Sequence, residues 1–134
     1  MTPYRTRELD SMLQLVNEAE AVLRSSTTPL AEFGRLLDES WRINRTLRDQ
    51  ISTPIIDEIY KAGLDAGAIG GKLLGAGGGG FMLFFVSPER RHAVKMRLQK
   101  LLCVPFSFST KGSELVVYET NGALHRQSLA LDVV

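Results

Sequence analysis

The residues between two apolar segments near the middle of the chain are nearly all glycine. In the stretch GGKLLGAGGGGFMLFFV, five of the six residues from Gly75 to Gly80 are glycine. Ordering a glycine costs roughly 0.5 to 1 kcal/mol more than ordering an alanine, and a tight hairpin needs only two turn residues. Successive residues without Cβ allow backbone N–H groups to converge on an anion such as phosphate. The run predicts either a phosphate-binding loop or a bland hairpin turn. Its residues are Gly75, Ala76, Gly77, Gly78, Gly79 and Gly80.

Three familiar nucleotide-binding loops do not fit this run. Gly75, Gly77 and Gly80 have the spacing G-x-G-x-x-G, but the dinucleotide-binding form requires a helix after the third glycine, and an aromatic, strand-like segment follows here. The P-loop pattern fails because Leu73 stands where Ser or Thr should follow Lys72. A protein-kinase glycine loop requires a lysine on the next strand, whereas VSPERR leads into a helix. The run therefore needs another explanation.

Cations near the run are candidate phosphate contacts. Lys72 precedes the loop on an apolar strand, where it either contacts phosphate, pairs at an interface or faces solvent. Arg42, Arg45 and Arg48 are spaced three apart on a predicted helix, so they lie near one face. That face either binds the phosphate of an acceptor or is solvated.

The remaining chemistry-bearing residues suggest structure more than catalysis. Trp41 continues an apolar helical stripe, which favours a core position over a stacking platform. Asp57 and Glu58 are adjacent on a helix and point apart, so they form no acid–base pair. His92 and His125 lack a second ligand at metal-binding spacing. The sequence thus predicts no catalytic residue and no metal site in this chain.

The elements that must position the loop begin with three helices. A helix from about Thr6 to Arg24 is predicted by one apolar stripe that requires a partner surface. Thr28-Pro29 and Thr53-Pro54 each combine a capping hydroxyl with a proline set for the first helical turn. Gly67 is placed to close the third helix in the left-handed conformation. The first stripe consists of Leu9, Met12, Leu13, Val16, Ala19 and Leu23, and the third helix is expected to turn Ile56, Ile59, Tyr60 and Leu64 inward.

Strand-like segments follow the helices. AIGGKLL and FMLFFV flank the glycine run as antiparallel neighbours would. Ser87-Pro88-Glu89 starts a further helix, and VPFSFS and ELVVYE read as two more strands. This order predicts an α+β fold of the ferredoxin-like kind, with a four-stranded, mostly antiparallel sheet and helices on one face. Residues 1–120 are expected to form the domain, and residues 121–134 a tail that folds back as a hairpin at Asn121-Gly122 or frays. The further helix is expected to present Val94, Leu98, Leu101 and Leu102 on one face.

Composition excludes several classes of protein. The 134 residues are 44% hydrophobic and 23% charged, which is typical of one globular domain. A net charge of +1 gives no general attraction for nucleic acid or anionic membranes. The lone Cys103 excludes an internal disulfide framework. The charged N-terminal segment and the lack of a long apolar run predict a cytoplasmic protein with no membrane partner.

The stretch GGKLLGAGGGGFMLFFV closely resembles the third conserved motif of the GHMP small-molecule kinases. The similarity extends over about Tyr4 to Glu119, through LLDESWRINRTLRDQISTPIIDEIYKAG and VPFSFSTKGSELVVYE, and is greatest to the sugar-kinase branch that acts on D-glycero-D-manno-heptose 7-phosphate. The resemblance implies a ferredoxin-like domain in which Gly75 to Gly80 lie beside the ATP phosphates and the acceptor. It also implies ATP and Mg²⁺ as cofactors of the complete enzyme and a sugar phosphate as its substrate.

The same resemblance implies that this chain holds only the C-terminal half of such a kinase. The family's own nucleotide loop, its Mg²⁺ ligand and its catalytic aspartate belong to an N-terminal lobe, and no residue here matches them. We expect the chain alone to bind ATP poorly and to transfer no phosphate. An apolar face left by that lobe is expected to support a homo-oligomer. The alternative is a stand-alone binding or oligomerising module that retains the fold.

Overall fold

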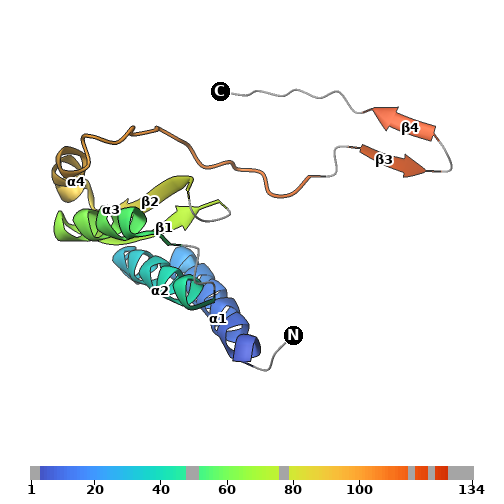
Figure 1. Ribbon diagram of the computed structural model, residues 1–134. Coiled ribbons are helices and arrows are strands. Elements are labelled where there is room, and N and C mark those ends of the chain that lie inside the picture. Colours follow the sequence, from blue (N-terminus) through green and yellow to red (C-terminus); the bar gives the residue numbers. More distant parts are fainter. Residues whose placement is uncertain (1–3, 48–51, 76–78, 115–116, 121–122, 127–134) are drawn as a thin grey trace. The chain divides into compact units, whose positions relative to one another are not determined.

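The computed structural model describes residues 4–47, 52–75, 79–114, 117–120 and 123–126 (Figure 1). The chain divides into two compact units, Met1–Cys103 and Val104–Val134. The first unit contains the helices, a β-hairpin and the glycine loop, and it carries the candidate site.

Three helices open the first unit, as predicted. They are α1 (Tyr4–Arg24), α2 (Ala31–Leu47) and α3 (Pro54–Asp65). The Thr53 side chain accepts a hydrogen bond from the Ile56 backbone N–H at 3.3 Å and so caps α3. After α3, Gly67 has a φ of 112°, which is the left-handed conformation expected for it.

The start of α2 differs from the prediction. The helix begins at Ala31 rather than directly after Thr28. The Glu32 and Phe33 backbone N–H groups donate to the carbonyls of Pro29 and Leu30, so Pro29 belongs to a preceding turn. The Thr28 N–H donates to the Ser25 hydroxyl at 2.9 Å, so Thr28 forms part of the connection from α1.

The two strands beside the glycine run have the predicted bounds. β1 (Ala68–Leu74) and β2 (Phe81–Val86) pair antiparallel, with Leu74 opposite Phe81 next to the loop. The register shifts between Ala68 and Gly70, which places an irregularity at Ile69. The glycine run thus starts directly after one strand and ends directly before its antiparallel neighbour.

Helices α2 and α3 cover opposite faces of this hairpin, which corrects the prediction of helices on one face. A Cβ added at Gly63 of α3 would lie 2.3 Å from the ring of Phe84, and one added at Gly34 of α2 would lie 2.8 Å from the ring of Phe85. Consecutive residues of a strand point to opposite faces, so the two helices sit on different sides (Figure 1). Small residues in both helices make this double approach sterically possible.

The core of the first unit lies around Trp41, which is only 1% exposed and confirms its predicted structural role. Trp41 packs with Ile56 and Tyr60 of α3 and with Leu73 of β1. The Trp41 and Tyr60 rings lie 6.1 Å apart at 48°, and Tyr60 stacks on Phe84 at 6.1 Å. This cluster ties α2 and α3 to the strand that enters the loop.

The apolar stripe of α1 is only partly buried. Leu15 is 8% exposed and packs inward, with Met12 and Ala19 half-buried beside it. Four other apolar residues of the predicted stripe face solvent, namely Leu9 at 47%, Leu13 at 62%, Val16 at 61% and Leu23 at 61% exposure. The helix therefore meets α2 along a narrower line than the sequence predicted. Among the described helices, none has the length and hydropathy needed to cross a bilayer.

The helix after β2 is shorter than predicted. A 3₁₀ turn, η1 (Pro88–Arg90), leads into α4 (Arg91–Arg97), in which Val94 is buried. Since α4 ends at Arg97, Leu101 and Leu102 do not continue its buried face and are 46% and 88% exposed.

The second unit contains a separate hairpin of β3 (Val117–Thr120) and β4 (Ala123–Arg126). The residues Asn121-Gly122, predicted as its turn, lie outside the described residues. The predicted strand VPFSFS is not a strand, and Phe106 and Phe108 are 63% and 86% exposed. Within the described residues there are two two-stranded sheets, so the predicted four-stranded sheet is not confirmed. Alternation alone is insufficient, because a strand also requires a partner for its backbone groups.

Candidate functional site

The glycine loop is exposed where it leaves the hairpin. Gly75 and Gly80, at its two ends, have φ values of 117° and 123°, a conformation that side chains strongly disfavour. A Cβ at Gly80 would lie 2.4 Å from the Leu74 carbonyl oxygen. Glycine is therefore required at both ends for conformation and, at Gly80, also for space. Ala76, Gly77 and Gly78 lie outside the described residues.

Gly79 has a different reason to lack a side chain. It is exposed, and a Cβ built on it meets no atom within 4 Å. No steric requirement within the described residues explains this glycine. Bare backbone facing open space is what close approach of an anion such as phosphate would use.

Two helix ends support the strand that enters the loop. Ile56, in the first turn of α3, packs in the same cluster as Leu73 of β1. Arg45, in the last turns of α2, pairs with Asp57 of α3 at 3.2 Å. The C-terminal end of α2, the N-terminal end of α3 and the loop therefore gather at one end of the unit, which we call the loop end.

Arg42 and Arg45, predicted to contact phosphate, lie near the loop end. Each of them forms an ion pair with an aspartate. The Nε atom of Arg42 lies 2.9 Å from Oδ2 of Asp38, with the arginine 72% exposed and the aspartate 16% exposed. Asp57 forms an ion pair with Arg45 and accepts a hydrogen bond from the Ser52 hydroxyl at 2.6 Å. Arg48 lies outside the described residues. The pairing orients Arg42 and Arg45 while leaving much of each guanidinium open to solvent.

Asp38 also connects α2 to α3, a role that the sequence interpretation missed. The Tyr60 hydroxyl donates a hydrogen bond to Oδ1 of Asp38. Burial of the phenol, followed by this bond to the carboxylate, raises the pKa of Tyr60 well above its ordinary value. The four-residue spacing of Asp38 and Arg42 on a helix was the available sequence signal for their pair, whereas the contact with Tyr60 depends on the tertiary fold.

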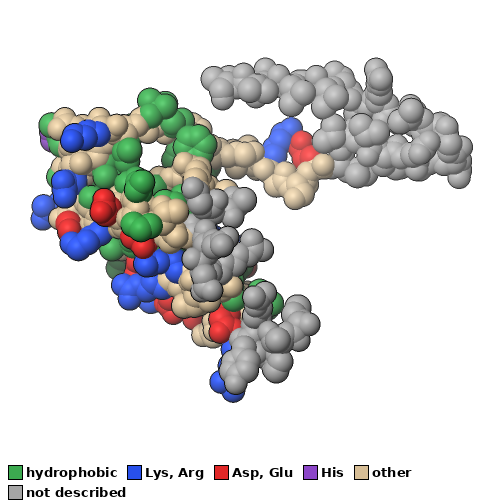
Figure 2. All heavy atoms as spheres, viewed as in Figure 1, with side chains coloured by type: hydrophobic (Ala, Val, Ile, Leu, Met, Phe, Trp, Pro, Cys, Tyr) green, Lys and Arg blue, Asp and Glu red, His purple; other side chains and the backbone are tan. Residues whose placement is uncertain are grey.

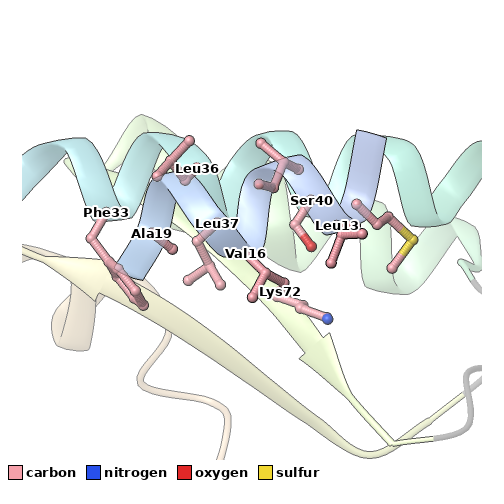
Figure 3. A pocket seen from close by; sticks show the side chains of 10 residues that line it. Leu13, Val16, Ala19, Phe33, Leu36, Leu37, Ser40 and Lys72 are labelled. Carbon is pink, nitrogen blue, oxygen red and sulfur yellow. The ribbon is translucent and has the colours of Figure 1, made fainter. Parts of the chain in front are cut away.

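Lys72 lies in a different environment from the arginines. It is half-buried and lines a groove of about 290 Å³ between α1 and α2 (Figure 3). No carboxylate of the described residues lies within ion-pair distance of its ammonium group. The groove walls are otherwise almost entirely apolar and consist of Met12, Leu13, Leu15, Val16, Ala19, Phe33, Leu36, Leu37 and Ser40.

Two glycines of β1, just before the run, are required for packing. A Cβ at Gly70 would lie 1.9 Å from the Gly34 carbonyl oxygen, so α2 touches β1 by its main chain. A Cβ at Gly71 would lie 2.7 Å from the Leu83 carbonyl oxygen. The described glycines of this stretch therefore divide into Gly70 and Gly71, which pack on β1, and Gly75, Gly79 and Gly80, which are exposed.

Charge on the visible face is mixed, with basic and acidic side chains interspersed (Figure 2). Within the part of the chain that the structure describes, no three His, Cys, Asp or Glu side chains gather as metal ligands. The site geometry thus offers exposed main chain and oriented guanidinium groups near one loop.

Comparison with known proteins places this arrangement in a family. The family model for the C-terminal region of GHMP kinases matches residues 19–102. The chain is 33% identical to the D-glycero-alpha-D-manno-heptose 7-phosphate kinase of Campylobacter jejuni, covering 79% of this chain and 32% of that protein. It is 40% identical to the mevalonate kinase of Pyrococcus abyssi, covering 64% of this chain and 26% of that protein.

A third relative is a two-function protein. The L-fucokinase/L-fucose-1-P guanylyltransferase of Bacteroides fragilis is 37% identical over 58% of this chain and 8% of its own length. The chain therefore spans about a third or less of each of these relatives. The family match covers α2, α3, the hairpin with the glycine loop, and α4. The chain belongs to the GHMP kinases, and what it contains is their C-terminal domain.

Proposed function

We propose that this chain is the C-terminal domain of an ATP-dependent sugar-phosphate kinase, with a heptose 7-phosphate as the acceptor. The complete enzyme would transfer the γ-phosphate of ATP to a sugar hydroxyl. The observation that carries the proposal is the geometry of the described loop ends, where Gly75, Gly79 and Gly80 are exposed and Gly75 and Gly80 adopt left-handed conformations beside two paired strands. The greater coverage of the Campylobacter jejuni heptose kinase supports a sugar phosphate over mevalonate.

The loop would act by positioning. Phosphoryl transfer depends mainly on alignment and charge stabilisation, and the open backbone at Gly79 leaves room for a phosphate oxygen close to the main chain. The hairpin pairing and the core around Trp41 support the two strands from which the loop starts and ends. In this role the chain supplies one wall of the active cleft and no acid or base.

The arginines of the loop end would receive the acceptor's own phosphate. Arg42 and Arg45 keep donors open to solvent although each is paired with a carboxylate. A dianionic phosphate would compete well for such guanidinium donors. Lys72 would serve at an interface instead, since the groove that it lines is apolar.

The remaining parts of the active site would come from an N-terminal lobe. ATP and Mg²⁺ would bind chiefly to that lobe, which would also supply the catalytic aspartate. We therefore propose that the chain alone is inactive.

The alternative is a binding or oligomerising module that acts without a catalytic lobe. The exposed apolar stripe on α1 favours it, because a surface of this kind is typical of a protein interface. The kinase proposal explains the exposed glycines at the loop ends, because they would face the N-terminal lobe. The alternative gives these glycines no role.

A domain-exchange experiment tests the proposal. This chain replaces the matched segment of the Campylobacter jejuni heptose kinase, and ADP release is measured with MgATP and either D-glycero-D-manno-heptose 7-phosphate or mevalonate. We expect turnover with the heptose phosphate, little with mevalonate, and none from the isolated chain. Robust ADP release by the isolated chain would contradict the proposal.

Two matched glycine variants of the chimera test the loop. Gly79→Ala and Gly112→Ala each place a methyl group in open space at an exposed position. We expect the Gly79 variant to lose at least about tenfold in kcat/KM, a loss equivalent to about 1.4 kcal/mol of transition-state stabilisation. The Gly112 variant should retain full activity. Equal activity of the two variants would remove the phosphate role of the loop.

A further inference from the structure

Helix α1 carries a second apolar stripe that the rest of the described chain leaves uncovered. Leu9, Leu13, Val16 and Leu23 are 47–62% exposed and follow steps of four, three and seven residues. With Glu20 included, the steps alternate four and three, which is the spacing of a helix-pairing seam. The inward stripe of the same helix, through Met12, Leu15 and Ala19, already packs against α2.

The seam continues into the groove that contains Lys72. Leu13 and Val16 belong to both, and the close view shows Lys72 extending beneath these two side chains (Figure 3). A half-buried ammonium group among apolar side chains favours an approaching anion. The groove and the seam therefore form one surface that suits an amphipathic helix with an acidic side chain.

The same helix in another copy of the chain has those properties, since its seam contains one acidic residue, Glu20. We propose that two copies of this chain pair through α1, antiparallel, about a two-fold axis near Val16. This pairing sets Leu9 of one copy opposite Leu23 of the other. The seam from Leu9 to Leu23 is about 21 Å long at 1.5 Å per residue, so the dimer is weak and depends on concentration.

Charge complementarity selects the antiparallel arrangement. With the axis near Val16, Glu20 of one copy lies level with Met12 and Leu13 of the other, beside Lys72 in the groove. Glu20 already accepts from Arg24 on its own helix at 2.8 Å, and its carboxylate retains acceptor sites for a second cation. Asp10 of one copy approaches Arg24 of the other at each end of the seam. A parallel pair would instead place Glu20 beside Glu20.

Sedimentation of the full chain over about a hundredfold range of concentration tests the dimer. We expect reversible dimers, and a dissociation constant at least about tenfold higher for Val16→Glu. Ile55→Glu is the matched control, because Ile55 is 69% exposed but lies outside the seam, and it should leave dimerisation unchanged. A wild-type chain that stays monomeric throughout, or equal effects of the two variants, overturns the proposal.

Charge exchange tests the register without adding a charge to the apolar seam. Glu20→Lys and Lys72→Glu should each raise the dissociation constant at least several-fold, and the double variant should recover most of the affinity. Circular dichroism confirms that each chain is folded. Failure of the double variant to recover, with all chains folded, contradicts the Glu20–Lys72 contact and with it the proposed register.

Cross-linking tests the direction of the helices. In a Cys103→Ser background, chains with Leu9→Cys are mixed with chains with Leu23→Cys and treated with a short bis-maleimide. Antiparallel pairing gives mainly mixed cross-links, whereas a preference for Leu9→Cys with itself overturns the antiparallel arrangement. None of these readouts requires kinase activity, so the dimer and the proposed function stand or fall separately.

Discussion

The Tyr60 hydroxyl donates to the Asp38 carboxylate and thereby joins α3 to α2. Tyr60 is 7% exposed, and the Asp38 side chain is 16% exposed. A buried hydrogen bond to a charged acceptor contributes about 1.5 kcal/mol or somewhat more. We therefore expect Tyr60→Phe to lower the free energy of unfolding by about that amount, measured by urea denaturation. Tyr118→Phe is the control, because it removes the same hydroxyl group from a tyrosine of the second unit.

The same bond predicts an alkaline loss of stability. The pKa of Tyr60 is raised above its ordinary value of 10.0, first by burial and then by Asp38. The unfolded chain therefore releases this proton at lower pH than the folded chain, so the stabilising contribution is complete below pH 10 and falls as the pH rises further. Unfolding curves between pH 9 and 11 should show a smaller decline for Tyr60→Phe than for the wild type. Parallel declines would contradict the assignment.

Main-chain contact between α2 and β1 predicts a severe effect at Gly70. A Cβ at this position would lie 1.9 Å from the Gly34 carbonyl oxygen, and backbone atoms cannot rotate away. We expect Gly70→Ala to cost about 3 kcal/mol or more, or to prevent folding. Gly112→Ala meets no atom within 4 Å and should melt with the wild type. A Gly70→Ala chain of normal stability would show that α2 does not lie this close.

Trp41 predicts the largest loss among single side chains of the core. It is 1% exposed and contacts both α3 and β1. Trp41→Ala should lower the free energy of unfolding by about 3 to 5 kcal/mol, while Leu102→Ala, at a position 88% exposed, should change it by less than about 0.5 kcal/mol. Chemical denaturation with tryptophan-independent detection, such as circular dichroism, compares the two.

The paired arginines predict a separation of binding from stability. The two arginine side chains are 72% and 41% exposed, and ion pairs of solvent-accessible arginines contribute about 1 kcal/mol or less, so Arg42→Gln and Arg45→Gln should remain folded. In the chimera, each should raise KM for the heptose phosphate several-fold, with a smaller change in KM for ATP. Arg35→Gln is the control, because Arg35 pairs with Glu32 and Glu39 on an exposed part of α2. An unchanged KM in both variants would remove them from the acceptor site.

Local signals predicted most of the first unit because they do not depend on distant partners. The cap at Thr53, the left-handed Gly67 and the two apolar runs around the loop fixed α3, β1 and β2 closely. The predicted strand at 104–109 failed for the opposite reason, since its alternating residues pair with no strand among the described residues. The exposure of half of the α1 stripe could not be predicted either, because it depends on how much of α1 the surface of α2 covers.

The candidate site was predicted in composition but not in organisation. Residue types alone identified the glycine run, Lys72 and the arginines as candidates. They did not show that Gly70 and Gly71 serve packing, because a Cβ clash depends on tertiary approach. They also did not identify the carboxylate partners of the arginines, which are Asp38 for Arg42 on the same helix and Asp57 of α3 for Arg45.

The close passage of α2 over Gly70 has a consequence for engineering. Because the backbones of α2 and β1 are in direct contact at Gly34 and Gly70, neither position has room for a side chain. Under the proposed function, libraries meant to alter acceptor preference would gain little at Gly34 and Gly70 and would target Arg42, Arg45 and their solvent-facing neighbours. Substitutions at the exposed arginines would therefore leave the packing of α2 on β1 unchanged.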